Sequence, residues 1–301
     1  MKRPTTRGPS RKSSTGRQGP PPQGPSARQG SPAKGPPGRP GRGADTRGTS
    51  DRGAIAGPPL DGEIVFGLRA GLAVLAAREG DILRVAHDRD VRGEIADLAR
   101  HCVARSIPLV EMSPGELARI AETTHHEGLV VMTRPRKWTS LAVLGDRLVA
   151  SRGVAIALDR VRNPYNIGAI LRTAAFLGID AAILGSIAPH PALPADAVRV
   201  SEGGAEHLPL ARTTDLADTL GRLRARGVKV LGADGAADTG AIGLRIDRPV
   251  VIVVGHEREG ISDRVRAQCD TLIAIAGTGT IESLNVAVAS GLLMSEALRA
   301  R

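Results

Sequence analysis

Five short, almost wholly apolar runs follow one another between Val154 and Ile275, and they constrain the fold more than any other feature of this sequence. The runs are VAIAL (154–158), AAIL (181–184), VKVLG (228–232), VVIVVG (250–255) and LIAI (272–275). Runs of this length and composition are typical of strands that are covered on both faces, as in parallel sheets. We therefore expect an α/β fold built on a parallel sheet.

The segments between these runs have helical spacing. In TTDLADTLGRLRARG, Thr213 or Thr214 is placed to cap the start of a helix and Gly227 suits its end, while one face carries Leu216, Leu220 and Leu223. Helices that alternate with parallel strands cover the faces of the sheet. Ligands of open parallel sheets bind beyond the carboxyl ends of the strands, so those ends are the expected place for chemistry.

A second, smaller α/β unit is predicted over residues 61–136. The spacing predicts helices in LRAGLAVLAAREG (68–80) and VRGEIADLARHCVARS (91–106), and strands in ILRVAH (82–87) and GLVVM (128–132). Residues 137–152 are expected to link this unit to the larger one, residues 153–301, although SLAVL within the linker has the composition of an ordered segment.

The first 60 residues differ from the rest in composition and charge. Residues 1–57 contain 12 Lys or Arg and two acidic residues, so they carry the whole net charge of +10 of the 301-residue chain. They are rich in Gly, Pro, Ser and Arg and cannot bury enough apolar surface to offset the entropy of ordering. We expect a disordered basic tail that either binds nucleic acid through phosphates or only aids solubility.

Other classes of protein are disfavoured by the sequence. No apolar run approaches the roughly 20 residues of a membrane span, and no secretory signal is evident, so we expect a cytoplasmic protein without a membrane partner. Cys102 and Cys269 lack a CxxC spacing, which predicts reduced thiols and no metal site. Gly277 and Gly279 match part of GxGxxG, but Glu282 takes the third glycine position, which argues against a dinucleotide fold.

Polar or glycine-rich residues follow three of the predicted strands. LDRVRNPYNIGAILRTAAFLG has a turn at Asn163-Pro164 and then Asn166, which is placed to cap a helix, with Arg172 off the apolar stripe. VVIVVGHEREGIS places Glu257 in a glycine-containing loop. IAGTGTIESLNVAVASG has a flexible glycine loop followed by Ser283, which is placed to cap the last helix.

Each of these segments, taken alone, also has an ordinary structural explanation. A lone arginine such as Arg172 is usually solvated, GHEREG is compatible with a plain turn, and the small residues of the last helix serve packing. Taken together, in this order and spacing, the three segments resemble the signature motifs of the SpoU (TrmH) family of RNA ribose 2′-O-methyltransferases, within the SPOUT superfamily. The resemblance spans residues 154–301 and lies in NPYNIGAILRTA, GHEREGIS and IAGTGTIESLNVAVA.

The resemblance implies a deep trefoil knot and S-adenosyl-L-methionine as the cofactor, bound by loops at the strand ends. It places five residues at that cofactor: Gly255, Ile275, Gly277, Gly279 and Leu284. The family usually has proline where this sequence has Ala276, and the loss of a fixed φ predicts a less preorganised loop.

Five further residues are placed around the reacting ribose by the same resemblance: Asn166, Arg172, Glu257, Ser283 and Asn285. Family proposals make the arginine a base. Because a guanidinium group is essentially always protonated, we favour a role for Arg172 in binding phosphate and stabilising the developing alkoxide. Asn166, Ser283 and Asn285 would orient the hydroxyl and the loops.

The resemblance also implies a homodimer and a structured RNA substrate, either rRNA or tRNA. Residues 61–136 resemble, more loosely, the ribosomal-protein-like RNA-binding domain that precedes the knot in many members. Trp138 either stacks on a base or anchors the linker, and His125 and His126 are better explained as structural or interfacial than as catalytic.

Two other functions are kept as alternatives at this stage. One is a knotted RNA-binding protein without catalysis that acts in ribosome or RNA assembly, an idea that the long tail and Ala276 favour. The other is methylation of a base, which SLNVAVA disfavours because this signature belongs to the ribose-modifying branch.

Overall fold

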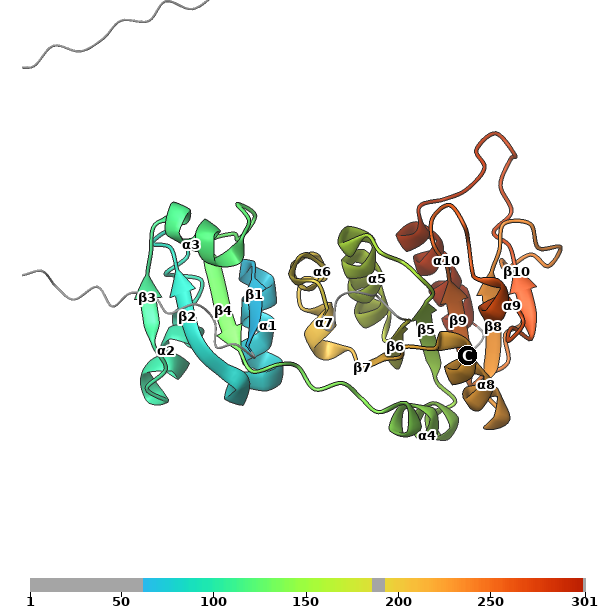
Figure 1. The fold of residues 1–301 in the computed structure, drawn as a ribbon, viewed down its shortest axis with the longest axis horizontal. Helices are drawn as coiled ribbons and strands as arrows, with labels where there is room; N and C mark the ends of the chain where they lie inside the picture. The colour runs from blue at the N-terminus through green and yellow to red at the C-terminus, as the bar shows by residue number, and fades with distance from the viewer. Residues whose placement is uncertain (1–61, 186–192, 300–301) are drawn as a thin grey trace, which may run out of the picture. The chain divides into compact units, whose positions relative to one another are not determined.

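Two β-sheets organise the residues that the computed structural model describes, 62–185 and 193–299 (Figure 1). All of these residues belong to one unit that begins at Ala54. The predicted tail, residues 1–60, lies outside the described residues. No helix in the described ranges is long and apolar enough to cross a membrane.

The smaller sheet has the order β1-β4-β2-β3. Its strands are β1 (Glu63–Phe66), β2 (Ile82–His87), β3 (Leu109–Glu111) and β4 (Leu129–Thr133). β4 is antiparallel to both β1 and β2, whereas β3 runs parallel to β2. The predictions of β2 and β4 are confirmed, and β1 and β3 are additional strands that the sequence reading missed because each has four residues or fewer.

Four helical segments accompany this sheet: α1 (Leu68–Arg78), the 3₁₀ turn η1 (Glu79–Asp81), α2 (Ala96–Ala104) and α3 (Pro114–Ala121). α1 is confirmed. α2 begins five residues later than predicted, because residues 91–95 form turns around Gly93, a poor helix former. α3 was missed, although Ser113 and Glu116 form a capping box at its start.

The larger sheet is parallel throughout, as predicted, with the order β10-β8-β9-β5-β6-β7. Its strands are β5 (Val154–Leu158), β6 (Ala181–Leu184), β7 (Leu210–Arg212), β8 (Lys229–Ala233), β9 (Val250–Val254) and β10 (Thr271–Ile273). β7 was not predicted. The chain moves outward from β5 to β7 and then crosses to the other side, so the direction of strand order changes between β5 and β9. Ligands of parallel sheets bind at such a switch point.

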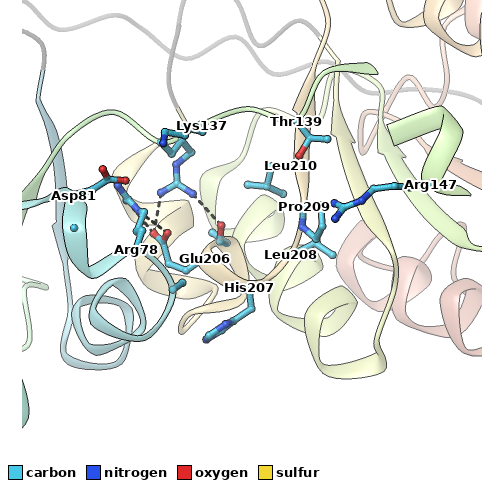
Figure 2. Close-up of a pocket in the computed structure, with 14 residues that line it drawn as sticks. Arg78, Asp81, Lys137, Thr139, Arg147, Glu206, His207, Leu208, Pro209 and Leu210 are labelled. Carbon is cyan, nitrogen blue, oxygen red and sulfur yellow. Dashed lines mark hydrogen bonds and ion pairs between the residues drawn. The ribbon is translucent and has the colours of Figure 1, made fainter. Parts of the chain in front are cut away.

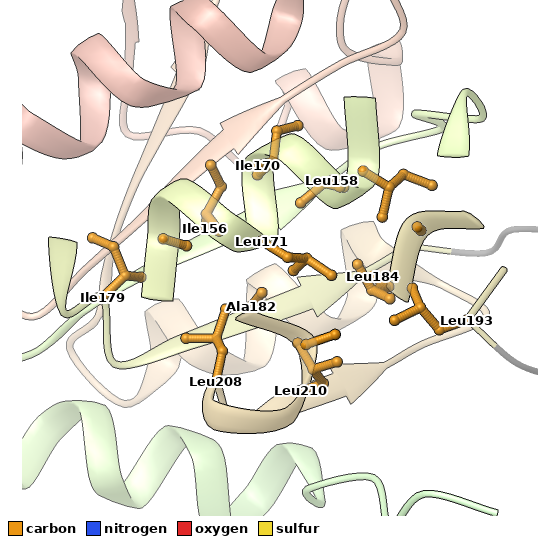
Figure 3. Packing of buried hydrophobic residues seen from close by; sticks show 14 of the residues in the cluster. Ile156, Leu158, Ile170, Leu171, Ile179, Ala182, Leu184, Leu193, Leu208 and Leu210 are labelled. Atoms are coloured by element: carbon orange, nitrogen blue, oxygen red, sulfur yellow. The ribbon is translucent and has the colours of Figure 1, made fainter. Parts of the chain in front are cut away.

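Helices cover both faces of this sheet. They are α4 (Leu141–Ser151), α5 (Pro164–Leu177), α6 (Ala195–Val200), α7 (Gly204–His207), α8 (Leu216–Ala225), α9 (Asp263–Arg266) and α10 (Val286–Arg299). Alternate residues of β5 enter opposite cores: Ile156 and Leu158 pack with α5 and α10, whereas Ala155 and Ala157 pack with α4, α8 and α9. Figure 3 shows Ile156 and Leu158 against the Ile170 and Leu171 side of α5.

Two helices begin at caps other than those predicted. α5 is capped by Asn163, whose Oδ1 accepts a hydrogen bond from the Tyr165 N–H at 2.9 Å, so Asn166 lies inside the first turn. α8 is capped by Asp215 and not by Thr213 or Thr214. In both cases the side chain nearest the first turn reaches the free N–H groups.

The predicted linker, residues 137–152, contains α4, whose start is capped by Ser140. Before it, the Thr139 N–H donates to the Leu210 carbonyl at 2.8 Å, and the Arg212 guanidinium lies 5.0 Å from the centroid of the Trp138 ring. Trp138 also packs against the core. The geometry therefore favours the anchoring role of Trp138 over base stacking.

A buried cluster of four charges joins the smaller sheet to α7. Arg78 and Arg136 both contact the carboxylates of Glu63 and Glu206, with nitrogen–oxygen distances of 2.6 to 3.2 Å. Figure 2 shows Arg78 and Glu206 beside a cavity of about 530 Å³. Burial alone raises the pKa of Glu206, but hydrogen bonds and charge from Arg78 and Arg136 outweigh it and hold this pKa below the ordinary 4.5.

Candidate active site at the carboxyl ends of three strands

Three segments at the carboxyl edge of the larger sheet meet through two side-chain amides and a carboxylate. The Asn166 Nδ2 donates a hydrogen bond to Glu257 Oε1 at 2.6 Å, and the Asn285 Nδ2 donates to Asn166 Oδ1 at 3.0 Å. These residues follow β5, β9 and β10, respectively. One residue from each of the three sequence segments therefore contributes to a single hydrogen-bonded chain, Glu257–Asn166–Asn285.

Buried Asp159 ties the first loop to the second. It follows β5 directly, and its Oδ2 accepts a hydrogen bond from the Ser262 N–H at 2.6 Å. Arg160 reinforces the link by donating to Glu259 at 2.6 Å and to the Gly260 carbonyl at 3.2 Å. Neither residue was predicted from the sequence to belong to the site. The feature that could have indicated them is that two charged residues stand immediately after a buried strand.

The second loop closes on itself and presents Glu257. His256 and Gly260 exchange backbone hydrogen bonds at 3.0 and 2.8 Å. A Cβ atom at Gly255 would lie 2.2 Å from the Gly260 carbonyl carbon, and Gly260 has a φ of +66°. Both glycines are thus required for this tight turn, which carries Glu257 to the Asn166 amide.

Asn285 both joins the site and starts α10. Its Oδ1 accepts a hydrogen bond from the Ala287 N–H at 2.8 Å, so the cap of α10 is Asn285. The prediction that Ser283 caps this helix was wrong. Asn is as good a cap as Ser and stands directly before the first helical residue. Ser283 is exposed, and within residues 62–185 and 193–299 no hydrogen bond forms to its side chain.

Arg172 makes no hydrogen bond or ion pair with the hydrogen-bonded chain Glu257–Asn166–Asn285. It is six positions after Asn166 on α5, roughly 9 Å along the axis, and its Nη1 lies 2.9 Å from Glu202 Oε1. Arg69 of α1 approaches the other oxygen of Glu202 at 3.7 Å. The structure thus brings together three of the five residues expected around the ribose, whereas Arg172 pairs with a carboxylate that the sequence reading did not single out.

The loop after β10 holds four of the five residues expected at the cofactor: Ile275, Gly277, Gly279 and Leu284. Gly279 has a φ of +81°, and a Cβ atom at Gly277 or Gly279 would meet nothing within 4 Å. Ile281 and Leu284 expose large apolar side chains on the same loop. Exposed apolar side chains can contact an adenine ring and open backbone can approach polar cofactor groups closely, so these residues fit the sulfonium cofactor S-adenosylmethionine.

Neither the cysteines nor the acidic groups indicate another kind of centre. Cys102 and Cys269 are free, and burial raises the pKa of the Cys269 thiol to about 11, which keeps it protonated and unreactive. No cluster of three or more metal-ligating side chains occurs in the described part of the chain. The cavity in Figure 2 is lined by none of the ten predicted site residues.

Comparison with known proteins agrees with this geometry. A model of the SpoU rRNA Methylase family matches residues 153–295, which contain all ten predicted site residues. The 23S rRNA (guanosine-2′-O-)-methyltransferase RlmB of Vibrio cholerae is 33% identical over 248 residues, which cover 80% of this chain and 98% of that protein. The protein of the same name from Pseudomonas aeruginosa is 38% identical over 197 residues, covering 65% and 79% of the two chains.

A solved structure shares the architecture. The S-adenosylmethionine-bound rRNA methyltransferase of Sinorhizobium meliloti superposes with a TM-score of 0.66 and 26% identity, covering 79% of this chain and 87% of the other. Together with the family match and the three-loop site, this shows that the chain belongs to the SpoU rRNA Methylase family and is an S-adenosylmethionine-dependent RNA 2′-O-methyltransferase.

Proposed function

We propose that this enzyme methylates the ribose 2′-hydroxyl of a guanosine in 23S rRNA, and that Glu257, Asn166 and Asn285 form the centre of its active site. The observation that carries the site assignment is the hydrogen-bonded chain in which Asn166 bridges Glu257 and Asn285. The substrate assignment is supported by relatives named as 23S rRNA (guanosine-2′-O-)-methyltransferases. Such a substrate implies a cytoplasmic enzyme.

The site residues suit the orientation of a ribose hydroxyl. S-adenosylmethionine, when bound, supplies an electrophilic methyl group. Asn166 occupies one carboxylate oxygen of Glu257, and among the described residues no hydrogen bond reaches the other oxygen, Oε2, which is therefore able to accept one from a ribose hydroxyl. Asn285 in turn fixes the Asn166 amide, so the acceptor is positioned before the substrate arrives.

Arg172 and Ser283 complete the proposed site without touching this chain of residues. The Arg172 guanidinium stabilises negative charge, either of an RNA phosphate or of the alkoxide that develops as the hydroxyl proton leaves. Ser283 lies two residues before Asn285 on the exposed loop and contributes a hydroxyl toward the ribose. Gly255, Ile275, Gly277, Gly279 and Leu284 contact the cofactor, and Gly255 also shapes the Glu257 loop.

The substrate assignment is tested by incubating the full chain with labelled S-adenosylmethionine and either 23S rRNA or tRNA from a strain that lacks this enzyme. We expect label in 23S rRNA and none in tRNA, with Asn166→Ala as the inactive control. Label confined to tRNA would overturn the rRNA assignment while leaving the methyltransferase activity intact.

We also propose that the enzyme is a homodimer that uses the exposed surface of α5 and α10. These helices pack together, Thr173 of α5 lies beside Gly291 of α10, and both helices expose large apolar side chains, namely Phe176, Val288 and Leu292. Phe176 is 88% exposed. Exposed apolar side chains on two helices that pack together would form such an interface.

Phe176→Glu should convert the dimer to a monomer in analytical ultracentrifugation, because a carboxylate would be buried without a partner. Val103→Glu, on α2 and 79% exposed, is the matched control and should remain dimeric. A wild-type protein that sediments as a monomer at micromolar concentration would refute the dimer. The knotted path and an RNA-binding role for residues 61–136 stay predictions of the resemblance. The domain boundaries, and a basic tail over residues 1–60 that either binds nucleic acid or only aids solubility, stay predictions from composition and charge.

A further inference from the structure

Tyr165 is an aromatic residue that stands next to the site and is left half exposed. It precedes Asn166 in the first turn of α5, and 47% of its surface is accessible. The Asn163 side chain fixes its backbone by accepting the Tyr165 N–H at 2.9 Å. A ring in this position loses much of the free energy that burial would provide, so core packing does not account for it.

One side of the Tyr165 ring is supported by a held arginine. The Arg199 guanidinium carbon of α6 lies 6.0 Å from the ring centroid. The Arg199 side chain is only 16% exposed and is retained by Glu127 at 3.4 Å and Asp196 at 3.6 Å. A cation at this distance is attracted to the ring and restricts its motion. The exposed remainder of the ring is thus presented to solvent in a defined orientation.

No other Phe, Trp or Tyr side chain of the described residues is available beside Asn166. The chain has four such residues, all within the described ranges. Phe66 is buried, Trp138 is covered by Arg212, and Phe176 lies eleven positions along α5, roughly 16 Å from Tyr165. Among the described Phe, Trp and Tyr residues, Tyr165 is therefore the one on which a nucleobase near the reacting ribose can stack.

We infer that Tyr165 stacks on a nucleobase of the substrate RNA, at or next to the nucleotide whose ribose is methylated. The inference rests on the proposed function, since it assumes that RNA reaches the Asn166 site. It adds a substrate-positioning residue beyond the ten predicted ones. Stacking on an aromatic ring tolerates any base, so Tyr165 contributes to RNA affinity more than to the choice of base.

Three substitutions separate stacking from packing. Tyr165→Phe keeps the ring, Tyr165→Leu keeps apolar bulk without a ring, and Tyr165→Ala removes both. With 23S rRNA as substrate, we expect the KM for RNA to rise about tenfold in the Leu and Ala variants and to stay near wild type in the Phe variant. The kcat and the Kd for S-adenosylmethionine should change less than about twofold, because the substitutions alter neither the hydrogen-bonded chain Glu257–Asn166–Asn285 nor the loop after β10.

An unchanged KM for RNA in Tyr165→Ala, or a Leu variant equal to wild type, would overturn the inference. The same variants are also compared by direct binding of 23S rRNA, a readout that does not need turnover. If the wild type methylates no rRNA, the proposed function fails. The stacking role is then judged by whether the Leu and Ala variants alone lose RNA affinity.

Discussion

Replacing Arg172 with alanine should lower the rate of RNA methylation by roughly a hundredfold or more and leave the Kd for S-adenosylmethionine unchanged. Arg172 is not part of the loop proposed to contact the cofactor, and its guanidinium is the one on α5 that could bind a phosphate in exchange for Glu202. The rate is measured with labelled cofactor under single-turnover conditions, and cofactor affinity by calorimetry.

Arg69→Ala is the matched control for this result. It also removes an arginine from Glu202, but Arg69 lies on α1 of the smaller unit and its contact is longer, at 3.7 Å. It should keep the wild-type rate within about threefold. Near wild-type turnover by the Arg172 variant would show that this residue has been wrongly assigned to the site.

Glu206→Gln should lower the free energy of unfolding by about 3 kcal/mol, the second large effect. The Glu206 side chain is 2% exposed, and its carboxylate is shared by Arg78 and Arg136. Neutralising it leaves two buried guanidinium groups with Glu63 as their remaining buried acid. Urea unfolding followed by circular dichroism measures the change.

Asp218→Asn provides the control for the charge cluster, because the Asp218–Arg222 pair on α8 is exposed. Its loss should lower the free energy of unfolding by less than about 0.5 kcal/mol.

The lowered pKa of Glu206 also predicts that stability depends on pH. Its pKa is lowered in the folded protein, so its stabilisation is present above its ordinary pKa of 4.5 and is lost as the pH falls below that value. Glu206→Gln should remove this part of the acid sensitivity. Equal stability of the two variants would contradict the account.

Strands could be predicted most reliably from the sequence where every residue of the strand is buried. β5 and β9 are apolar at every position because both faces are covered, and these unbroken apolar runs therefore predicted the parallel sheet directly. β7 was not predicted because it has only three residues and ends in the exposed Arg212. The helix starts were misplaced where several capping residues stand in a row, as at Thr213, Thr214 and Asp215, since composition does not say which side chain faces the first turn.

The site could be predicted as a set of strand ends but not as a set of contacts. Residues after β5, β9 and β10 had to lie at one edge of the sheet, and the resemblance named Asn166, Glu257 and Asn285 among them. The Asn166 amide bridges residues 91 and 119 positions away, which no local pattern records. The pairing of Arg172 with Glu202 was equally invisible, because Glu202 lies in a turn that only packing brings to α5.

The most direct test of the central claim is to locate the methyl group. Labelled S-adenosylmethionine and the full chain are incubated with 23S rRNA from a strain that lacks the enzyme, and the RNA is digested to nucleosides. We predict a single labelled product, 2′-O-methylguanosine, which disappears with Asn166→Ala. Label on a base, or no incorporation by a protein that demonstrably binds the cofactor and this RNA, would contradict the account.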